Sequence, residues 1–106
     1  MAKGMKENQI VVMIKRPGEA PELDPLFDND LKAFQEAVGG YIETFTLTPE
    51  IVVICNEEGK LKGLPYNVTI SREDFVGTIV VAGVKEDEFT SLRAAAVPLV
   101  RALLGG

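Results

Sequence analysis

The sequence predicts an α+β domain, with one mainly antiparallel sheet of about five strands and two helices packed on one face. Short runs that are apolar throughout, or that alternate between apolar and polar residues, are bounded by Gly, Pro and Asn, which is typical of strands. Two other segments place their apolar residues at helical spacing. This mixture of short strands and two helices predicts the α+β class.

A hairpin over residues 51–64 is the clearest strand signal. Ile51–Cys55 is an apolar run that is long enough for a buried strand and too short for a helix. Asn56–Gly59 fits a type I turn, in which the asparagine side chain accepts from the backbone two residues on and the glycine is left-handed. The alternating residues Lys60–Lys62 are then expected to return as a strand with one solvent-facing side.

Three earlier segments also predict extended structure. Gln9–Lys15 is continuously apolar between polar ends, which is typical of a central strand. Tyr41–Leu47 alternates with period two, as a strand with two different faces does. Leu23–Phe27 follows a loop with two prolines and a glycine, and we expect it to continue as an extended segment over the surface with Leu26 or Phe27 tucked in.

Strand structure is expected again after the hairpin. Val68–Ile70 predicts a short extended piece, and the polar residues 71–74 predict a turn or a single helical turn. Phe75–Val84 predicts one long strand, in which Gly77 and Gly83 mark a bulge or a close backbone approach.

The first helix is expected to begin after Asp28–Asp30, which supplies N-cap candidates and negative charge. Leu31, Phe34 and Val38 form an apolar stripe, and Gly39-Gly40 predicts the C-terminal end in a left-handed cap. The helix is short, so packing against a sheet must stabilise it.

A second helix is expected to follow the charged turn at 85–88, with Thr90 or Ser91 as its cap. Pro98 either kinks this helix or starts a new one as its first residue. The apolar face of the helix is predicted to contain Leu92, Ala95 or Ala96, Leu99 and Leu103.

Length and composition predict one domain over residues 9–106, preceded by a flexible N-terminus at 1–8. No apolar run approaches the roughly 20 residues of a membrane helix, and no secretion signal is apparent. The single cysteine excludes an internal disulfide, which favours a reducing, cytoplasmic location. We expect no membrane association.

The absence of histidine excludes Ser-His-Asp and Cys-His nucleophilic sites and His-based metal sites. A formal net charge of −5 makes nucleic acid an unfavourable direct partner. Cys55 follows an apolar strand with no cationic neighbour in sequence, which predicts a structural, partly buried thiol. The acidic run at 86–88 lacks the spacing of a calcium loop and predicts a solvated turn. We therefore predict no catalytic residue, metal or cofactor.

A mixed polar patch around one end of the sheet is the first candidate for a binding surface, since binding residues favour loops on a rigid scaffold. Its acidic pair Glu57-Glu58 is more simply explained as solvated turn residues than as an acid–base or cation site, because adjacent residues at a tip lack burial and a third ligand. The candidate binding residues are Tyr41, Asn56, Glu57, Glu58, Lys60, Tyr66 and Asn67.

Four stretches together resemble a known family. These are Val38–Glu43, Cys55–Asn67, Val76–Thr78 and Phe89–Leu92, and the Asn-Glu-Glu-Gly-Lys-Leu block with the following Leu-Pro-x-Asn is fairly specific. Over roughly residues 8–92 the chain is similar to the domain of unknown function 3846 family, which occurs in bacteria, phages and mobile elements. The resemblance implies a small intracellular α+β domain with no established activity and no cofactor. The segment after Leu92 departs from the family pattern.

Three functional hypotheses follow. The leading one is a non-catalytic protein-binding or accessory module of phage or mobile-element type, with a protein partner or a homodimer formed through an edge strand. The alternative is a small ligand-binding or carboxylate-based enzyme domain that uses carboxylates and Lys60 near Tyr41 and Tyr66. A concave pocket that holds two of Glu43, Glu57, Glu58 and Lys60, with buried carboxylates, would favour it. The weakest is a carrier that exposes the C-terminal Gly105-Gly106.

Overall fold

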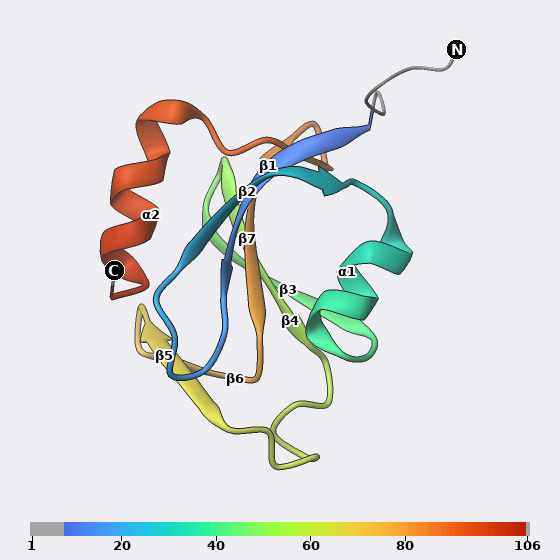
Figure 1. Cartoon of the computed structure of the whole chain (residues 1–106), viewed down its shortest axis with the longest axis vertical. Helices are drawn as coiled ribbons and strands as arrows, with labels where there is room; N and C mark the ends of the chain where they lie inside the picture. The colour runs from blue at the N-terminus through green and yellow to red at the C-terminus, as the bar shows by residue number, and fades with distance from the viewer. Residues whose placement is uncertain (1–7, 106) are drawn as a thin grey trace.

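Six strands form one antiparallel sheet in the computed structural model, which describes residues 8–105 (Figure 1). Their order across the sheet is β2-β1-β7-β4-β3, and β8 pairs with one end of β7. Two further strands, β5 and β6, form a separate hairpin. The strands are β1 (Gln9–Lys15), β2 (Glu22–Asp28), β3 (Ile42–Thr48), β4 (Ile51–Asn56), β5 (Tyr66–Ile70), β6 (Glu73–Val76), β7 (Ile79–Lys85) and β8 (Glu88–Thr90).

Two helices complete the fold, α1 (Leu31–Val38) and α2 (Val97–Leu103), and the predicted α+β class is confirmed. The placement of both helices on one face is wrong, because α1 covers one face of the sheet and α2 the other (Figure 1). The physical reason is that the central strands are apolar on both faces, and each face has to be covered.

The sheet therefore has a hydrophobic core on each face. The core on the α1 face contains Val12, Ile54 and Val80 with Phe34 and Val38. The core on the α2 face contains Met13, Val53 and Val81 with Val100 and Leu104.

Helix α1 has the predicted ends. Asp30 is its N-cap, and the Asp30 carboxylate accepts a hydrogen bond from the Ala33 backbone N–H at 2.8 Å. Gly39 closes it in the left-handed conformation, with φ of 83°. The buried Phe34 ring lies between Phe27 and Phe89, at centroid distances of 4.9 and 5.0 Å. These aromatic contacts hold a helix of only eight residues against the sheet.

The edge strand β2 corresponds to the predicted surface segment, and Phe27 rather than Leu26 is the buried residue. The N-terminal residues 1–7 of the predicted flexible segment lie outside the described residues. Asn8, the last residue of that segment, is bonded to the rest of the fold, because its carbonyl oxygen accepts a hydrogen bond from the Asn29 N–H at 2.8 Å.

The predicted hairpin at 51–64 is correct up to its turn and wrong after it. The Asn56 side chain accepts from the Glu58 N–H at 2.8 Å, as expected, but residues 57–63 form consecutive turns and no return strand. The reason is that β4 pairs with β3 on one edge and with β7 on the other, so a third neighbour has no edge to join. Gly59 does not have a positive φ; an added Cβ there would lie 2.9 Å from the Val76 side chain.

The predicted strand Phe75–Val84 is interrupted at Gly77, whose φ is 70°, and forms β6 and β7 in different sheets. The buried side chain of Asn67 fixes this junction. Its amide donates to the carbonyl oxygens of Lys15 at 2.8 Å and Gly77 at 2.7 Å, and its carbonyl oxygen accepts from Lys15 Nζ at 3.1 Å. Asn67 therefore ties the β5–β6 hairpin to the main sheet.

Pro98 starts a helix rather than kinking one: it lies in the first turn of α2, after a 3₁₀ turn at Ala94–Ala96. The predicted cap is wrong, because Thr90 ends β8 and Ala96 is the N-cap. The predicted apolar face is also only partly right. Because the 3₁₀ turn shifts the helical register, Val100 and Leu104 are buried with Leu92, while Leu99 and Leu103 are 54% and 39% exposed.

Replacing Asn67 with alanine is expected to lower the free energy of unfolding by about 2–4 kcal/mol. Two buried carbonyl oxygens lose the hydrogen bonds from its amide, and the Lys15 ammonium group keeps its bond to the Arg16 carbonyl oxygen but loses the one to Asn67. Urea denaturation measures this change. Thr46→Ala, on the exposed edge of the sheet, is the control and should change stability by less than about 0.5 kcal/mol. An equally small effect of Asn67→Ala would contradict the role of Asn67 as a tie.

Candidate functional site

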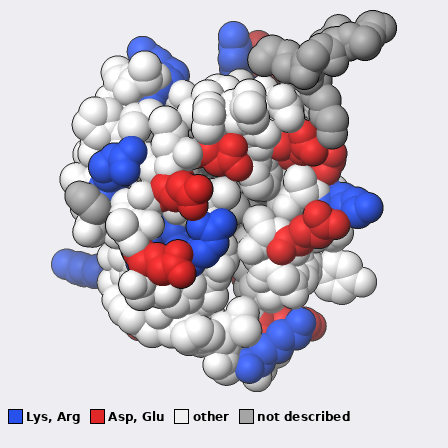
Figure 2. Space-filling view, in the orientation of Figure 1, with Lys and Arg blue, Asp and Glu red and all other residues white. Residues whose placement is uncertain are grey.

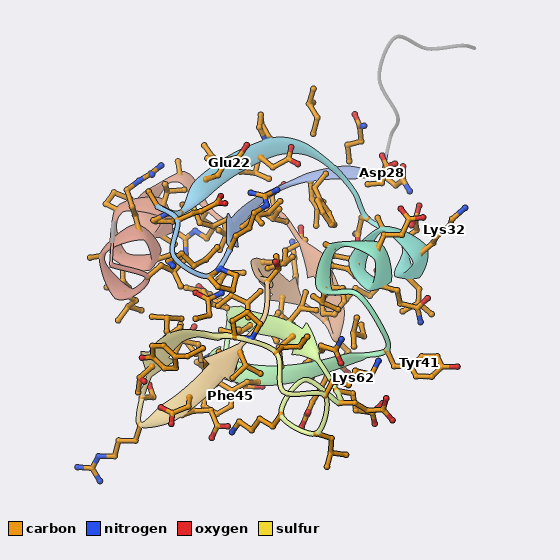
Figure 3. All side chains as sticks on the ribbon, turned by 60° about the horizontal axis from the view of Figure 1, so that its bottom comes forward. Glu22, Asp28, Lys32, Tyr41, Phe45 and Lys62 are labelled. Carbon is orange, nitrogen blue, oxygen red and sulfur yellow. The ribbon has the colours of Figure 1, made fainter. Side chains whose placement is uncertain are left out.

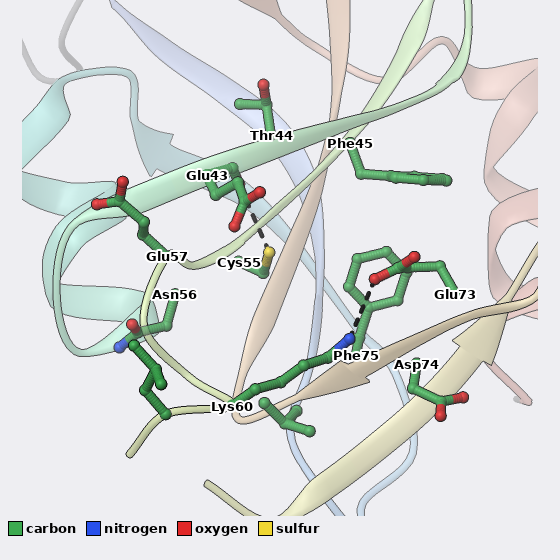
Figure 4. Close-up of a pocket in the computed structure, with 12 residues that line it drawn as sticks. Glu43, Thr44, Phe45, Cys55, Asn56, Glu57, Lys60, Glu73, Asp74 and Phe75 are labelled. Atoms are coloured by element: carbon green, nitrogen blue, oxygen red, sulfur yellow. Dashed lines mark hydrogen bonds and ion pairs between the residues drawn. The ribbon is translucent and has the colours of Figure 1, made fainter. Parts of the chain in front are cut away.

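A groove of about 300 Å³ lies between strand β3, the end of β4, the 57–63 loop and strand β6 (Figure 4). It forms because the chain leaves the main sheet after Asn56 and returns only at Ile79, so the β5–β6 hairpin faces β3. The groove is lined by Glu43, Thr44, Phe45, Cys55, Asn56, Glu57, Lys60, Leu61, Glu73, Asp74, Phe75 and Val76.

An aromatic pair closes one side of the groove. The Phe45 and Phe75 rings meet edge to face, with centroids 5.5 Å apart and an interplanar angle of 79° (Figure 4). Phe75 is buried and belongs to the core on the α2 face of the sheet, whereas Phe45 is half-buried. The groove therefore has an apolar wall that is anchored in the core.

The polar lining carries an excess of negative charge. Glu43, Glu57, Glu73 and Asp74 contribute four carboxylates and Lys60 one ammonium group, which leaves a formal charge of −3. Lys60 extends across the groove to Glu73, at 3.2 Å between Nζ and Oε2 (Figure 4). Both partners are more than 40% exposed, so this ion pair adds less than about 1 kcal/mol and can open for a ligand.

Cys55 lies in the groove and is half-buried, with its thiol donating to the carbonyl oxygen of Glu43 at 3.6 Å. Burial raises the pKa of this thiol to about 11, and the negative charges of Glu43 and Glu73 add to the effect against an opposing contribution from Lys60. Near neutral pH the sulfur is protonated and is a poor nucleophile. This agrees with the prediction of a structural, partly buried thiol.

Two of the seven candidate binding residues are held inside the structure. Asn67 is the tie described above, and Asn56 donates from its amide to the Val38 carbonyl oxygen at 3.1 Å. The Asn56 side chain also packs against Gly40, where an added Cβ would lie 2.9 Å from its amide nitrogen. These two asparagines position the 57–63 loop and the β5–β6 hairpin around the groove.

The other candidates divide between the groove and the surface outside it. Glu57 and Lys60 line the groove, whereas Glu58 pairs with Lys62 at 3.7 Å on the loop surface. Tyr41 is 69% exposed and projects away from the fold (Figure 3). Tyr66 is also exposed, and its hydroxyl contacts the Thr69 hydroxyl at 2.7 Å.

Sequence reasoning missed the residues that β6 brings to the groove, Glu73, Asp74 and Phe75. No local pattern could have found them, because β6 reaches β3 only through the excursion that Asn67 fixes. The alternation in Tyr41–Leu47 did predict Glu43 and Phe45 on one face of the strand, and both line the groove.

Within residues 8–105, no three acidic or cysteine side chains converge closely enough to hold a metal ion. In the same part of the chain, neither helix is long and apolar enough to cross a bilayer. On the face seen in Figure 2, acidic and basic side chains are interspersed, and its described residues form no continuous basic stripe.

Comparison with known proteins identifies the family of the chain but no individual relative. The chain belongs to the family described as a domain of unknown function (DUF3846), whose model matches residues 6–103. The match includes the segment from Leu92 to Leu103, so the predicted departure from the family pattern after Leu92 is wrong. No curated protein and no solved structure matches the chain.

The raised pKa of Cys55 predicts slow alkylation. With the native pKa near 11 and an ordinary value of 9.0, iodoacetamide at pH 8 should modify the native thiol about a hundredfold more slowly than the urea-unfolded thiol. The native rate should rise with pH as the thiol ionises. Glu43→Gln should lower the midpoint of this rise and Lys60→Gln should raise it. A native midpoint near 9 would contradict the burial of the sulfur.

Proposed function

We propose that this domain is a non-catalytic protein-binding module that receives its partner in the groove between β3, the 57–63 loop and β6. The observation that carries the proposal is the groove itself, which combines an aromatic wall with an excess of three negative charges. Apolar contacts flanked by charged groups are the usual composition of a protein interface. The β4 and β6 ends of the groove rest on the core, so the surface is preorganised.

Several features of the groove argue against catalysis. Cys55 is held as a thiol, and the carboxylates of Glu43 and Glu57 are exposed. Lys60 is paired with Glu73 in an exposed position. No general acid or base is therefore placed in a water-excluded pocket, as acid–base catalysis requires.

The alternative function, binding of a small ligand, is favoured by one observation. The groove is concave and holds three of the residues on which this hypothesis depends, Glu43, Glu57 and Lys60, within the size range of small-molecule sites. Its carboxylates are exposed rather than buried, so a ligand would have to be a cation bound close to solvent. We rank this function second.

The carrier hypothesis has less support. A carrier presents its terminal glycines on an extended tail, whereas here α2 runs to Leu103 and Leu104 is 1% exposed. Gly105 takes the left-handed conformation that ends a helix, with φ of 84°. Gly106 lies outside the described residues.

For the setting of the module, we propose the cytoplasm of a cell that carries a phage or mobile element. The resemblance described for the sequence motivates this setting, together with the single free cysteine. In this setting the acidic module would bind a basic surface of another protein, to which its charge is complementary.

Affinity capture from lysate of the producing cell tests the proposal. The bait is the full chain, compared with a groove variant, Glu43→Lys with Glu57→Lys, and a control variant of the same charge, Glu19→Lys with Glu86→Lys. All four positions are exposed, so the fold should be kept, and urea denaturation checks this. We expect a protein that the native and control chains capture and that the groove variant loses.

Two results would contradict the proposal. Equal capture by the groove variant would place the interface elsewhere. The second result is that no protein is captured specifically, while spermidine raises the melting temperature of the native chain but not that of the groove variant. This result would favour the small cationic ligand instead.

A further inference from the structure

Strand β3 presents an open edge beside the groove. It pairs with β4 alone and is the last strand in the order of the sheet. The Glu57 N–H donates to the Tyr41 carbonyl oxygen at 2.8 Å, which makes Tyr41 and, by alternation, Glu43 and Phe45 the residues whose backbone faces β4. The N–H and C=O groups of Ile42, Thr44 and Thr46 therefore point away from the sheet.

The opposite edge of the sheet, β2, is poorly suited to accept another strand. Pro25 lies within β2 and lacks an N–H, and the β1–β2 register shifts between Ile10 and Val12. The Asp24 carboxylate also accepts from the Leu26 N–H at 2.9 Å. Strand β3 has no proline and no lysine or arginine over its seven residues, and its register is regular from Ile42 to Thr46. Of the two edges, only β3 is left ready for pairing.

The open edge and the groove are continuous. Glu43 and Phe45 line the groove with their side chains, and Thr44, whose side chain lies on the other face of the strand, lines it as well. The groove thus reaches the backbone at the edge. A strand added to β3 would place every second side chain on the groove side, next to Glu43 and the aromatic wall.

The charge of this region selects the occupant. Four carboxylates against one ammonium group favour lysine and arginine side chains on the added strand. A second copy of this chain is disfavoured, because pairing β3 with β3 would bring two Glu43 side chains to one edge and join two molecules with a net charge of −5 each.

We propose that the partner contributes an extended segment rich in lysine and arginine, which adds to the open edge of β3 as a new strand and places its basic side chains in the groove. This inference rests on the proposed function and specifies how the same groove is occupied. Main-chain hydrogen bonds to Ile42, Thr44 and Thr46 would give affinity, and Glu43, Glu57 and Asp74 would give selectivity for basic side chains.

The test uses a displayed library of random peptides of about ten residues, enough to span β3, selected on the immobilised full chain. We expect the enriched peptides to carry lysine or arginine at alternate positions and to bind more weakly as salt increases. Affinity should fall at least about tenfold for Glu43→Lys with Glu57→Lys, and by less than about twofold for Glu19→Lys with Glu86→Lys.

Amide hydrogen exchange read by NMR distinguishes strand addition from other ways of filling the groove. On binding of an enriched peptide, exchange at the Ile42, Thr44 and Thr46 amides should slow, whereas the Glu43 and Phe45 amides should be slow already in the free chain. The peptide could instead bind the native chain and not the groove variant, while exchange at the edge amides of the native chain does not slow on binding. In that case the strand-addition inference is wrong and the binding function stands.

Other outcomes also decide the matter. Enrichment of acidic or uncharged peptides would overturn the basic-segment inference alone. The same holds if no peptide is enriched while the lysate partner is still captured through the groove. Slow exchange at the edge amides without peptide, together with concentration-dependent dimers in sedimentation, would assign the edge to a second copy of the chain. If the native chain enriches no peptide and captures no lysate partner through the groove, the inference and the proposed function are both overturned.

Discussion

The fold depends on one constraint, that strand β4 is paired on both of its edges. With β3 on one side and β7 on the other, the chain that leaves Asn56 cannot turn back beside β4. It makes an excursion through the 57–63 loop and the β5–β6 hairpin before entering β7. Since Asn67 ties this excursion to β1 and to the Gly77 junction, the hairpin is held at a fixed distance from β3. The groove is the space that this arrangement leaves.

The chemistry of the groove follows from what the excursion carries. The hairpin brings two acidic residues and a core phenylalanine to a strand that already presents Glu43 and Phe45. The resulting site combines an aromatic pair with carboxylates from both strands, and Lys60, which lines it, is paired with Glu73. Burial and the nearby charges of Glu43 and Glu73 keep Cys55 protonated near neutral pH, so its thiol is a poor nucleophile.

Much of the fold was predictable because local signals and burial agree. The cap at Asp30, the left-handed Gly39 and the apolar runs of β1 and β4 are each dictated by residues that are neighbours in sequence. The errors fall where a distant element decides. Lys60–Lys62 alternates like a strand but has no edge to pair with, and Leu99 and Leu103 have helical spacing but are exposed because the turn at Ala94–Ala96 resets the register.

The sequence by itself determined the α+β class, the central strands, the first helix with both of its caps, and the family. It also determined that the histidine-dependent sites are absent and that the chain is acidic. Only the tertiary structure decided that the helices lie on opposite faces, that Asn56 and Asn67 are structural, and that Glu43 meets Glu73 and Phe75 across a groove. The reason is that strand order and the packing of a hairpin depend on contacts between residues far apart in the chain, which local patterns do not encode.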